Sequence, residues 1–534
     1  MNYRMQSAFK KKYIYWSVFK CFFILSQLIG LRIENEVNLH RSVYILLFVG
    51  LFIFLDFIVQ MVYYLQKTIS KKTKIKSSVS NRYLFFSTAL TMTVLGFILL
   101  LIFYPGLITY DTATQLREAG GEIPLSDHHP VLLTFLFKLF CDPWKASENA
   151  NPGIFLFLSI QIILLSVVCG YSVCLIHTIT ENVITARIIK WLFILNPMLW
   201  NYTIMAGKDS TVAVLFLFYI CSVAEIVYIK NELTKRLFLQ IFLSTMLASL
   251  IRHNCFYAFL FSVPILVIYL KKTKAHTLIL YLTIIASVSL IHLWYYNSLN
   301  IERTSDGEKY TVFFQTTARM LYDHKDSLSE KELNVINNFM GDEDEIIRLY
   351  NRNLADPINN NLYNNSIEPK DKVRFFQQWF LLFFKFPKTY LKALANQDYG
   401  YFYLNYRKTI KPIFFITETI IYYPRITSYH FSLKNADFAL TIENALNTIY
   451  NLPIINLILS LGFSSWLLIY LLVSGIVNKN KKYLVVIFQV FIYFFSILLG
   501  PANGYYRYMI PIIVCIPFLI GLNQKKQLPC IPAV

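Results

Sequence analysis

The chain has 534 residues, of which 56% are hydrophobic and 15% are charged, and its formal net charge is +19. Soluble domains carry about 25% charged residues, so this composition excludes an ordinary soluble protein and indicates a polytopic membrane protein. The positive charge does not by itself indicate nucleic acid, because membrane proteins collect Lys and Arg in cytoplasmic loops. The eight cysteines include no CxxC pair and predict neither a disulfide framework nor a metal site.

About twelve apolar runs predict an all-α, multi-span helical bundle, since most approach the ~20 residues that cross a bilayer as a helix. The runs at 188–203 and 237–251 are short, and we expect them to be tilted or to stop inside the protein. The runs are 13–30, 43–65, 83–103, 153–177, 188–203, 209–229, 237–251, 254–270, 277–297, 453–477, 483–500 and 504–522.

The basic residues predict the orientation of these runs. Lys and Arg gather at 67–82, 230–236, 271–274, 479–482 and 525–526, which lie on one side if the N-terminus is cytoplasmic. Lys10 to Lys12 resemble the start of a signal peptide, but no small-residue cleavage site follows, so we expect this segment to be retained. The chain is therefore predicted to be a multi-pass protein of a cell membrane with a cytoplasmic N-terminus.

The chain is predicted to have three parts. They are an N-terminal transmembrane module with a first external loop at 104–152, a large and mostly helical extracytoplasmic segment, and C-terminal transmembrane helices, at 1–297, 298–452 and 453–534. In the external segment, Ser329 and Glu332 form the pattern of a capping box that opens a helix to about residue 351. An Asn-rich turn is expected at 359–365.

Two prolines are expected to bound a helix in this segment. Pro369 would open it, and Pro387 would break it. Its aromatic face, with Phe376, Phe380, Phe383 and Phe384, is expected to rest on the membrane surface.

Asp111 is the first candidate for chemistry, because it follows a long apolar run at the mouth of a membrane span. An ionisable group at a membrane edge needs a partner or a function. A carboxylate there can act as a general base or hold a metal. It can also simply cap a helix. Because Pro105 and Gly106 predict a turn just before it, we favour the functional interpretation.

Asp127, His128 and His129 form a second polar group in the same loop. One of the histidines, together with Asp111, could make a site for a hard cation or zinc. Adjacent histidines point in different directions, so a capping histidine and a packed histidine are the favoured alternative. Pro130 is expected to open an amphipathic helix over 131–140.

Polar residues at three other span ends are predicted to meet Asp111 on the outer face. Basic groups there suit an anionic lipid head group such as the phosphate of a polyprenyl carrier. The alternative is that they contact bulk lipid phosphate, as any Lys or Arg near a span end can. The candidates for substrate binding are Lys208, Asp209, Arg252, Asn254, Arg507 and Tyr508.

Gln315 and Arg319, with the aromatic run 399–403, are weaker candidates in the external segment. Aromatic faces stack on sugars, and Arg or Gln can bond sugar hydroxyls. An ordinary interfacial aromatic belt is the favoured interpretation of the run.

Known nucleotide and hydrolase motifs are missing from the sequence, which has no Walker loop, GxGxxG, GxSxG or HExxH pattern. A carrier should place ionisable residues near the middle of the membrane, where Asp56 and Glu225 are the main candidates. The polar residues instead gather at one face, which favours an enzyme over a carrier.

Several motifs together resemble bacterial polytopic proteins allied to the GT-C glycosyltransferases. They are YPGLITYDTATQLREAGGEIPLSDHHPVLLT, NPMLWNYTIMAGKDS, RHNCFYAF, QTTAR, FPKTYLKALANQDYGYFY and GYYRYMIPI. The resemblance implies a GT-C-like multi-span fold in a bacterial plasma membrane. It implies Asp111 as the acidic residue of the first external loop, with Lys208, Arg252 and Arg507 near the carrier phosphate. Thr112 stands where many members have a second acid, so a metal-independent mechanism is favoured and a divalent metal is possible.

The function predicted from these features is transfer of a sugar from a lipid-linked donor, a polyprenyl phosphate, to an acceptor in the cell envelope. The acceptor would be an envelope polymer, a glycolipid or a protein, and no nucleic acid is expected. The alternatives are a polymerase or flippase of lipid-linked oligosaccharides, a small-molecule carrier, and a non-catalytic envelope partner.

Overall fold

The computed structural model describes residues 2–35, 40–72, 79–147, 149–299, 301, 306–362, 367–406 and 416–523. The predicted basic residues Lys74, Lys76, Lys525 and Lys526, and Asn364 and Asn365 of the predicted turn, lie outside them. The described chain is almost entirely helical, and its one sheet has two short strands. This confirms the predicted all-α class.

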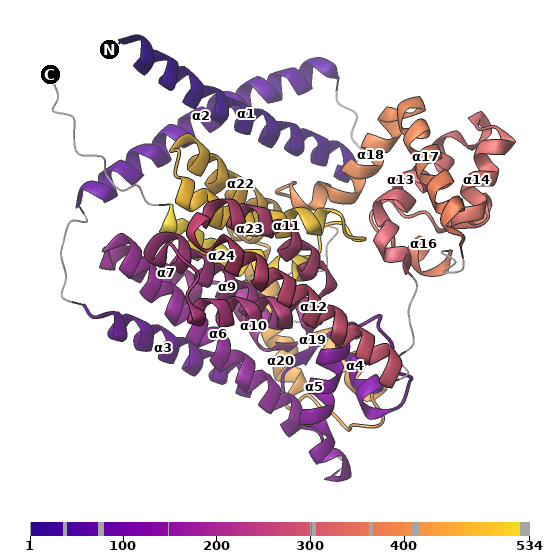
Figure 1. Ribbon diagram of the computed structural model, residues 1–534, viewed down its shortest axis with the longest axis horizontal. Helices are drawn as coiled ribbons and strands as arrows, with labels where there is room; N and C mark the ends of the chain where they lie inside the picture. Colours follow the sequence, from indigo (N-terminus) through magenta and orange to yellow (C-terminus); the bar gives the residue numbers. More distant parts are fainter. Residues whose placement is uncertain are drawn as a thin grey trace.

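Two large hydrophobic cores and one small cluster around Val131, Tyr295 and Ile301 organise the described residues. The larger core is shared by the helices before residue 299 and after residue 416, and the smaller one lies within 310–390. Figure 1 shows the smaller core as a separate lobe at the right, beside the main helical body. The predicted external segment 298–452 thus contributes to both cores, because residues 416–450 pack on the main body.

The main body begins with long apolar helices and ends with three more. Its elements are α1 (Asn2–Asn35), α2 (Arg41–Lys72), α3 (Asn81–Ile102), β1 (Leu107–Ile108), α4 (Tyr110–Gly120), α5 (Val131–Cys141), α6 (Asn151–Thr180), α7 (Val183–Ile194), α8 (Pro197–Thr203), β2 (Met205–Ala206), α9 (Lys208–Glu225), α10 (Lys235–Ile251), α11 (His253–Tyr269), α12 (Lys274–Ser298), α19 (Ile416–Tyr422), α20 (Ala436–Tyr450), α21 (Pro453–Leu459), α22 (Leu461–Val477), α23 (Lys481–Leu498) and α24 (Tyr506–Leu522).

Within the described residues, six helical stretches are long and apolar enough to cross a membrane, or up to eight if each of two bent pairs counts as one span. The bent pairs are α7 with α8 and α21 with α22, each with an angle of 55°. The number is below the twelve predicted runs, because runs such as 237–251, 254–270 and 504–522 form helices of only 17 residues. The six are Ile14–Asn35, Asn81–Ile102, Asn151–Thr180, Lys208–Lys230, Lys271–Ser298 and Lys481–Leu498.

The lobe is built from short helices with strong start signals. They are α13 (Thr311–His324), α14 (Glu330–Met340), α15 (Glu343–Leu349), α16 (Asp356–Asn361), α17 (Pro369–Lys385) and α18 (Pro387–Asp398). The capping box of Ser329 and Glu332 is present, but the helix it opens ends at Met340. The predicted extension to residue 351 was wrong. Gly341 adopts a positive φ of 99° and ends this helix, and the next helix, α15, begins at Glu343.

The two prolines act as predicted in α17 and α18. Each stands at the first position of a helix, so Pro387 ends one helix and opens the next. Phe380 and Phe384 are exposed on α17, whereas Phe375 and Leu382 on its other face are buried in the lobe core.

The lobe is held to the main body through Asn503, which lies just before α24. The Asn503 backbone N–H donates to the carbonyl of Asn353 at 3.0 Å, and its side-chain amide donates to the carbonyl of Asn396 at 3.0 Å. The Asn503 Oδ1 accepts from the backbone N–H of Gly400 at 2.8 Å. Buried amide groups bonded on several sides define one orientation, so the lobe fixes the backbone that leads into α24.

Candidate functional site

The short sheet brings two distant loops into register. β1 and β2 pair in parallel, with Leu107 opposite Met205 and Ile108 opposite Ala206. Each strand is followed within two residues by a helix, α4 after β1 and α9 after β2. The Thr112 hydroxyl donates to the Ala206 carbonyl at 2.6 Å and ties the first turn of α4 to β2. Asp111 and Lys208, which are 97 positions apart in sequence, therefore lie side by side.

Asp111 is a buried carboxylate held by two cations. Its Oδ2 lies 2.9 Å from the Nζ of Lys208 and 2.8 Å from the Nη1 of Arg507. Burial would raise the pKa of Asp111, but the charges of Lys208 and Arg507 outweigh it and hold that pKa well below its usual range. Asp111 is in the first turn of α4, where the helix dipole also favours a negative charge. It is not the N-cap, which is Thr109, so the capping alternative was wrong.

Arg507 lies among tyrosine rings at the start of α24. Its guanidinium carbon lies 5.2 Å from the ring centre of Tyr110 and 5.1 Å from that of Tyr508. The Tyr505 ring is 5.6 Å away. These contacts leave the Nε of Arg507 buried and without a hydrogen-bond partner. Tyr508, a predicted substrate-binding residue, therefore contacts Arg507. Tyr110 and Tyr505 contact Arg507 as well and were not among the predicted residues.

Arg252 and Asp209 form a second, more deeply buried ion pair next to the first. Both side chains are less than 10% exposed. Arg252 also lies over the Tyr508 ring, with its guanidinium carbon 4.7 Å from the ring centre. The two ion pairs thus share one aromatic neighbour. Asn254 is half-buried in the first turn of α11, two positions after Arg252.

His129 is the histidine of the pair that belongs to the Asp111 site. It is buried, whereas His128 is exposed, and the two ring centres are 4.7 Å apart. Burial and the charge of Lys208 lower the pKa of His129 to about 3, against the opposing charge of Asp111. His129 is therefore a neutral imidazole at ordinary pH, and its Nδ1 is buried without a partner. α5 begins after Pro130 as predicted, and no side chain caps it.

Asp127 faces a different group of residues from Asp111. Its Oδ2 accepts from the Tyr296 hydroxyl at 2.6 Å. The rings of His292 and Tyr296 stack with their centres 6.4 Å apart. Asp127 is thus placed with the C-terminal end of α12.

Gln315 and Arg319 lie in the lobe, apart from Asp111. Gln315 is fully buried in α13 and its amide donates to the Asn351 carbonyl at 2.6 Å. Arg319 pairs with Asp323 at 2.8 Å. The aromatic run 399–403 is likewise structural, since the buried Tyr401 donates through its hydroxyl to the Ala502 carbonyl at 3.0 Å.

Glu418 on α19 is a site residue that the sequence reasoning missed. The Oγ1 of its neighbour Thr419 accepts from the backbone N–H of Ile108 at 3.0 Å and donates to the Ile108 carbonyl at 3.2 Å. Glu418 interacts electrostatically with Arg507 and Asp111, and its Oε2 is buried without a hydrogen-bond partner. One feature of the sequence could have identified Glu418, which is the only charged residue in the stretch 416–424.

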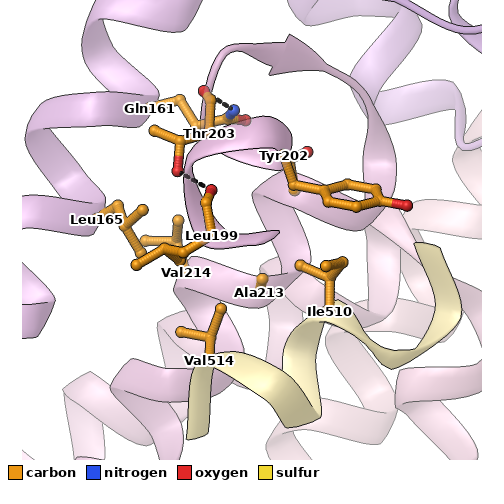
Figure 2. Close-up of a pocket in the computed structure, with 10 residues that line it drawn as sticks. Gln161, Leu165, Leu199, Tyr202, Thr203, Ala213, Val214, Ile510 and Val514 are labelled. Atoms are coloured by element: carbon orange, nitrogen blue, oxygen red, sulfur yellow. Dashed lines mark hydrogen bonds between the residues drawn. The ribbon is translucent and has the colours of Figure 1, made fainter. Parts of the chain in front are cut away.

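A small cavity lies behind the site, between α6, α8, α9 and α24. Its volume is about 10 Å³, close to the space that one water molecule occupies. Figure 2 shows Gln161 and Tyr202 among the side chains around it. Gln161 donates to the Thr203 carbonyl at 2.9 Å, while the Ser210 hydroxyl on the cavity wall is buried without a partner. The space suits a structural water and is too small for a substrate.

The carboxylates that a carrier would use are engaged elsewhere. Asp56 pairs with Lys20 between α1 and α2. Glu225 pairs with Arg236 and accepts from the Tyr171 hydroxyl at the end of α9. Among the residues that the structure describes, no three His, Cys, Asp or Glu side chains are grouped so that they could hold a metal. Asp111 contacts two cations instead, an arrangement that suits an anionic ligand better than a metal.

Fold and site together define a helical protein with apolar helices that could span a membrane and with a buried cluster of charged residues where several of its helices begin. The chain belongs to DUF6020, a family of unknown function whose profile matches residues 122–527. Comparison with curated proteins and with solved structures gave no match.

Proposed function

We propose that the protein is an integral membrane glycosyltransferase that uses a polyprenyl-phosphate sugar and acts on the outer side of a cell membrane. The observation that carries the proposal is the buried carboxylate of Asp111 between Lys208 and Arg507. A buried anion with two cations is a site where a second anion can compete for the same donors. The phosphate of a lipid carrier is such an anion, and the apolar helices around the site suit its prenyl chain.

The phosphate would change the state of Asp111. Without a ligand, the two cations keep Asp111 ionised and make it a weak base. When a phosphate binds Lys208 and Arg507, their charge is shared, and the pKa of Asp111 rises toward its ordinary value. The base is thereby strengthened only when the donor is present.

The reaction can be written with these residues. The acceptor hydroxyl oxygen forms a bond to the anomeric carbon, and the bond from that carbon to the phosphate oxygen breaks with its electron pair going to the phosphate. Asp111 takes the hydroxyl proton. Lys208 and Arg507 stabilise the negative charge that grows on the departing phosphate.

The test uses purified protein with native-like lipids and a panel of polyprenyl-phosphate sugars. Release of free polyprenyl phosphate is followed by mass spectrometry for the wild type and for Asp111→Asn. We expect release by the wild type and at least a hundredfold slower release by Asp111→Asn, and thermal unfolding of both proteins separates lost catalysis from lost structure. Activity of Asp111→Asn equal to that of the wild type would exclude Asp111 as the base.

A flippase or a small-molecule carrier would behave differently in the same assay. Either would leave every donor intact, and a carrier would tolerate Asp111→Asn while depending on Asp56 or Glu225. Absence of release from all donors would therefore lead to a transport assay on the same variants.

A further inference from the structure

Three polar atoms around Asp111 lack hydrogen-bond partners in the described structure. They are Nδ1 of His129, Nε of Arg507 and Oε2 of Glu418, and all three are buried. Buried polar atoms are nearly always bonded, and leaving one unbonded costs about 1–3 kcal/mol. Three such atoms around one ion pair indicate that a ligand or water completes the site.

The chemistry of two of these atoms identifies the missing group. Arg507 Nε carries a hydrogen and can only donate, whereas an ionised Glu418 can only accept. α19, which carries Glu418, packs against α4, and Asp111 of α4 is paired with Arg507. A hydroxyl group is the small group that donates and accepts at once, and it can satisfy both.

Glu418 is also held rigidly in the site. Thr419 pins α19 to β1 through both backbone groups of Ile108, three positions before Asp111. Burial raises the pKa of Glu418, and the charges of Asp111 and Glu443 add to this effect while Arg507 opposes it. Asp111 and Glu418 are thus two carboxyl groups of one site whose surroundings shift their acidity in opposite directions.

We propose that Glu418 binds a hydroxyl group of the acceptor next to the one that reacts, accepting a hydrogen bond from it while Arg507 Nε donates one to its oxygen. This deepens the proposed function and rests on it, because the hydroxyl is that of the acceptor. Asp111 remains the group that takes the proton, which comes from the neighbouring hydroxyl that attacks the anomeric carbon. Glu418 is then a substrate-binding residue that positions the acceptor.

The experiment compares wild type, Glu418→Ala and Glu418→Gln with a donor that the wild type consumes. Glycerol serves as the probe hydroxyl acceptor, and mass spectrometry follows both the glyceryl glycoside and free polyprenyl phosphate. We expect Glu418→Ala to transfer at least tenfold more slowly, with a donor KM within twofold of the wild type. Glu418→Gln keeps a carbonyl that can accept a hydrogen bond, so it should recover part of the rate.

The matched control is Glu343→Ala, which removes a half-buried glutamate of the lobe that pairs with Lys325 and accepts from Asn337, away from Glu418. It should transfer at the wild-type rate. Thermal unfolding of each variant separates loss of function from loss of structure. Wild-type transfer by Glu418→Ala, or a slow rate fully explained by a lower unfolding temperature, would overturn the inference and leave the proposed function intact. A wild type that consumes no donor would overturn both.

Discussion

At the scale of single residues, the site is defined by buried charges of opposite sign. Lys208, Arg252 and Arg507 face Asp111 and Asp209 in three buried ion pairs. Breaking a buried pair on one side leaves an uncompensated charge, which is far more costly than losing an exposed pair. Each of these charged residues therefore affects both the folding and the ligand affinity of the protein. The unfolding free energy and the ligand affinity must both be measured for each variant.

Lys208→Gln removes one of the two cations of Asp111 while Arg507 still pairs with it. A charge-assisted hydrogen bond contributes about 1.5–3 kcal/mol, so we expect the donor KM to rise roughly tenfold or more. Steady-state kinetics with the lipid-linked donor measures this change. The control is Lys434→Gln, an exposed lysine whose backbone bonds to Tyr104 near the same loop. A wild-type donor KM in Lys208→Gln would contradict a phosphate contact by Lys208.

His129 makes the stability of the protein depend on pH. Its pKa is about 3 in the folded protein, whereas an unfolded histidine has a pKa near 6.5. Between these values the unfolded chain binds a proton that the folded protein does not, so folding stability is lost as the pH falls from about 6.5 toward 3. At pH 4.5 the loss from this group is about 2–3 kcal/mol, from roughly 1.4 kcal/mol per pH unit.

His129→Gln removes that titration and keeps a polar side chain. We expect the variant to lose less unfolding free energy than the wild type between pH 7.5 and pH 4.5. Thermal unfolding in detergent at several pH values measures the difference. Equal pH dependence in the two proteins would mean that His129 is not buried as a neutral ring.

At the scale of secondary structure elements, the site depends on where helices begin. α4, α9, α11 and α24 all start beside the three ion pairs, and each contributes a charged or polar residue in its first turn or just before it. Free backbone N–H groups at a helix start favour anions. The elements thus give the site a positive potential that adds to that of its side chains.

The join between the lobe and α24 is tested by Asn503→Ala. Removing the side chain leaves the backbone N–H of Gly400 without a partner and loses the bond to the Asn396 carbonyl. We expect the unfolding free energy to fall by about 1–3 kcal/mol and donor turnover to fall with it, because Arg507 follows four residues later. Hydrogen exchange at residues 351–355 and 500–505 should accelerate. Unchanged exchange there would show that the lobe is held by other contacts.

At the scale of the whole molecule, periodicity and composition predicted the helical class, and hydrophobic runs predicted most long helices. They did not predict that residues 416–450 return to the main body, because the bonds of Thr419 with Ile108 and of Tyr423 with Gly106 join segments about 300 positions apart. Local patterns carry no information about such pairings. The number of spans was overestimated, since several of the predicted apolar runs form helices of only 17 residues.

The candidate site was predicted in part. Reasoning from span ends correctly brought Asp111, Lys208 and Arg507 to one place, because residues at the same side of a bundle must converge. Gln315 and Arg319, which were weaker candidates from the external segment, pack within the lobe instead. Glu418 was missed because its environment, and not its sequence neighbourhood, makes it unusual.

The pairing of β1 with β2 has a consequence for how the chain tolerates changes in length. Asp111 follows Ile108 by three residues, and Lys208 follows Ala206 by two, so the strand register sets the phase of both helices. One residue inserted after Ile108 would turn α4 by about 100° about its own axis, since a helix has 3.6 residues per turn. Asp111 would then leave its two cations while the hydrophobic run before it stayed unchanged. The number of residues between each strand and the helix that follows it is therefore constrained more tightly than the identity of those residues.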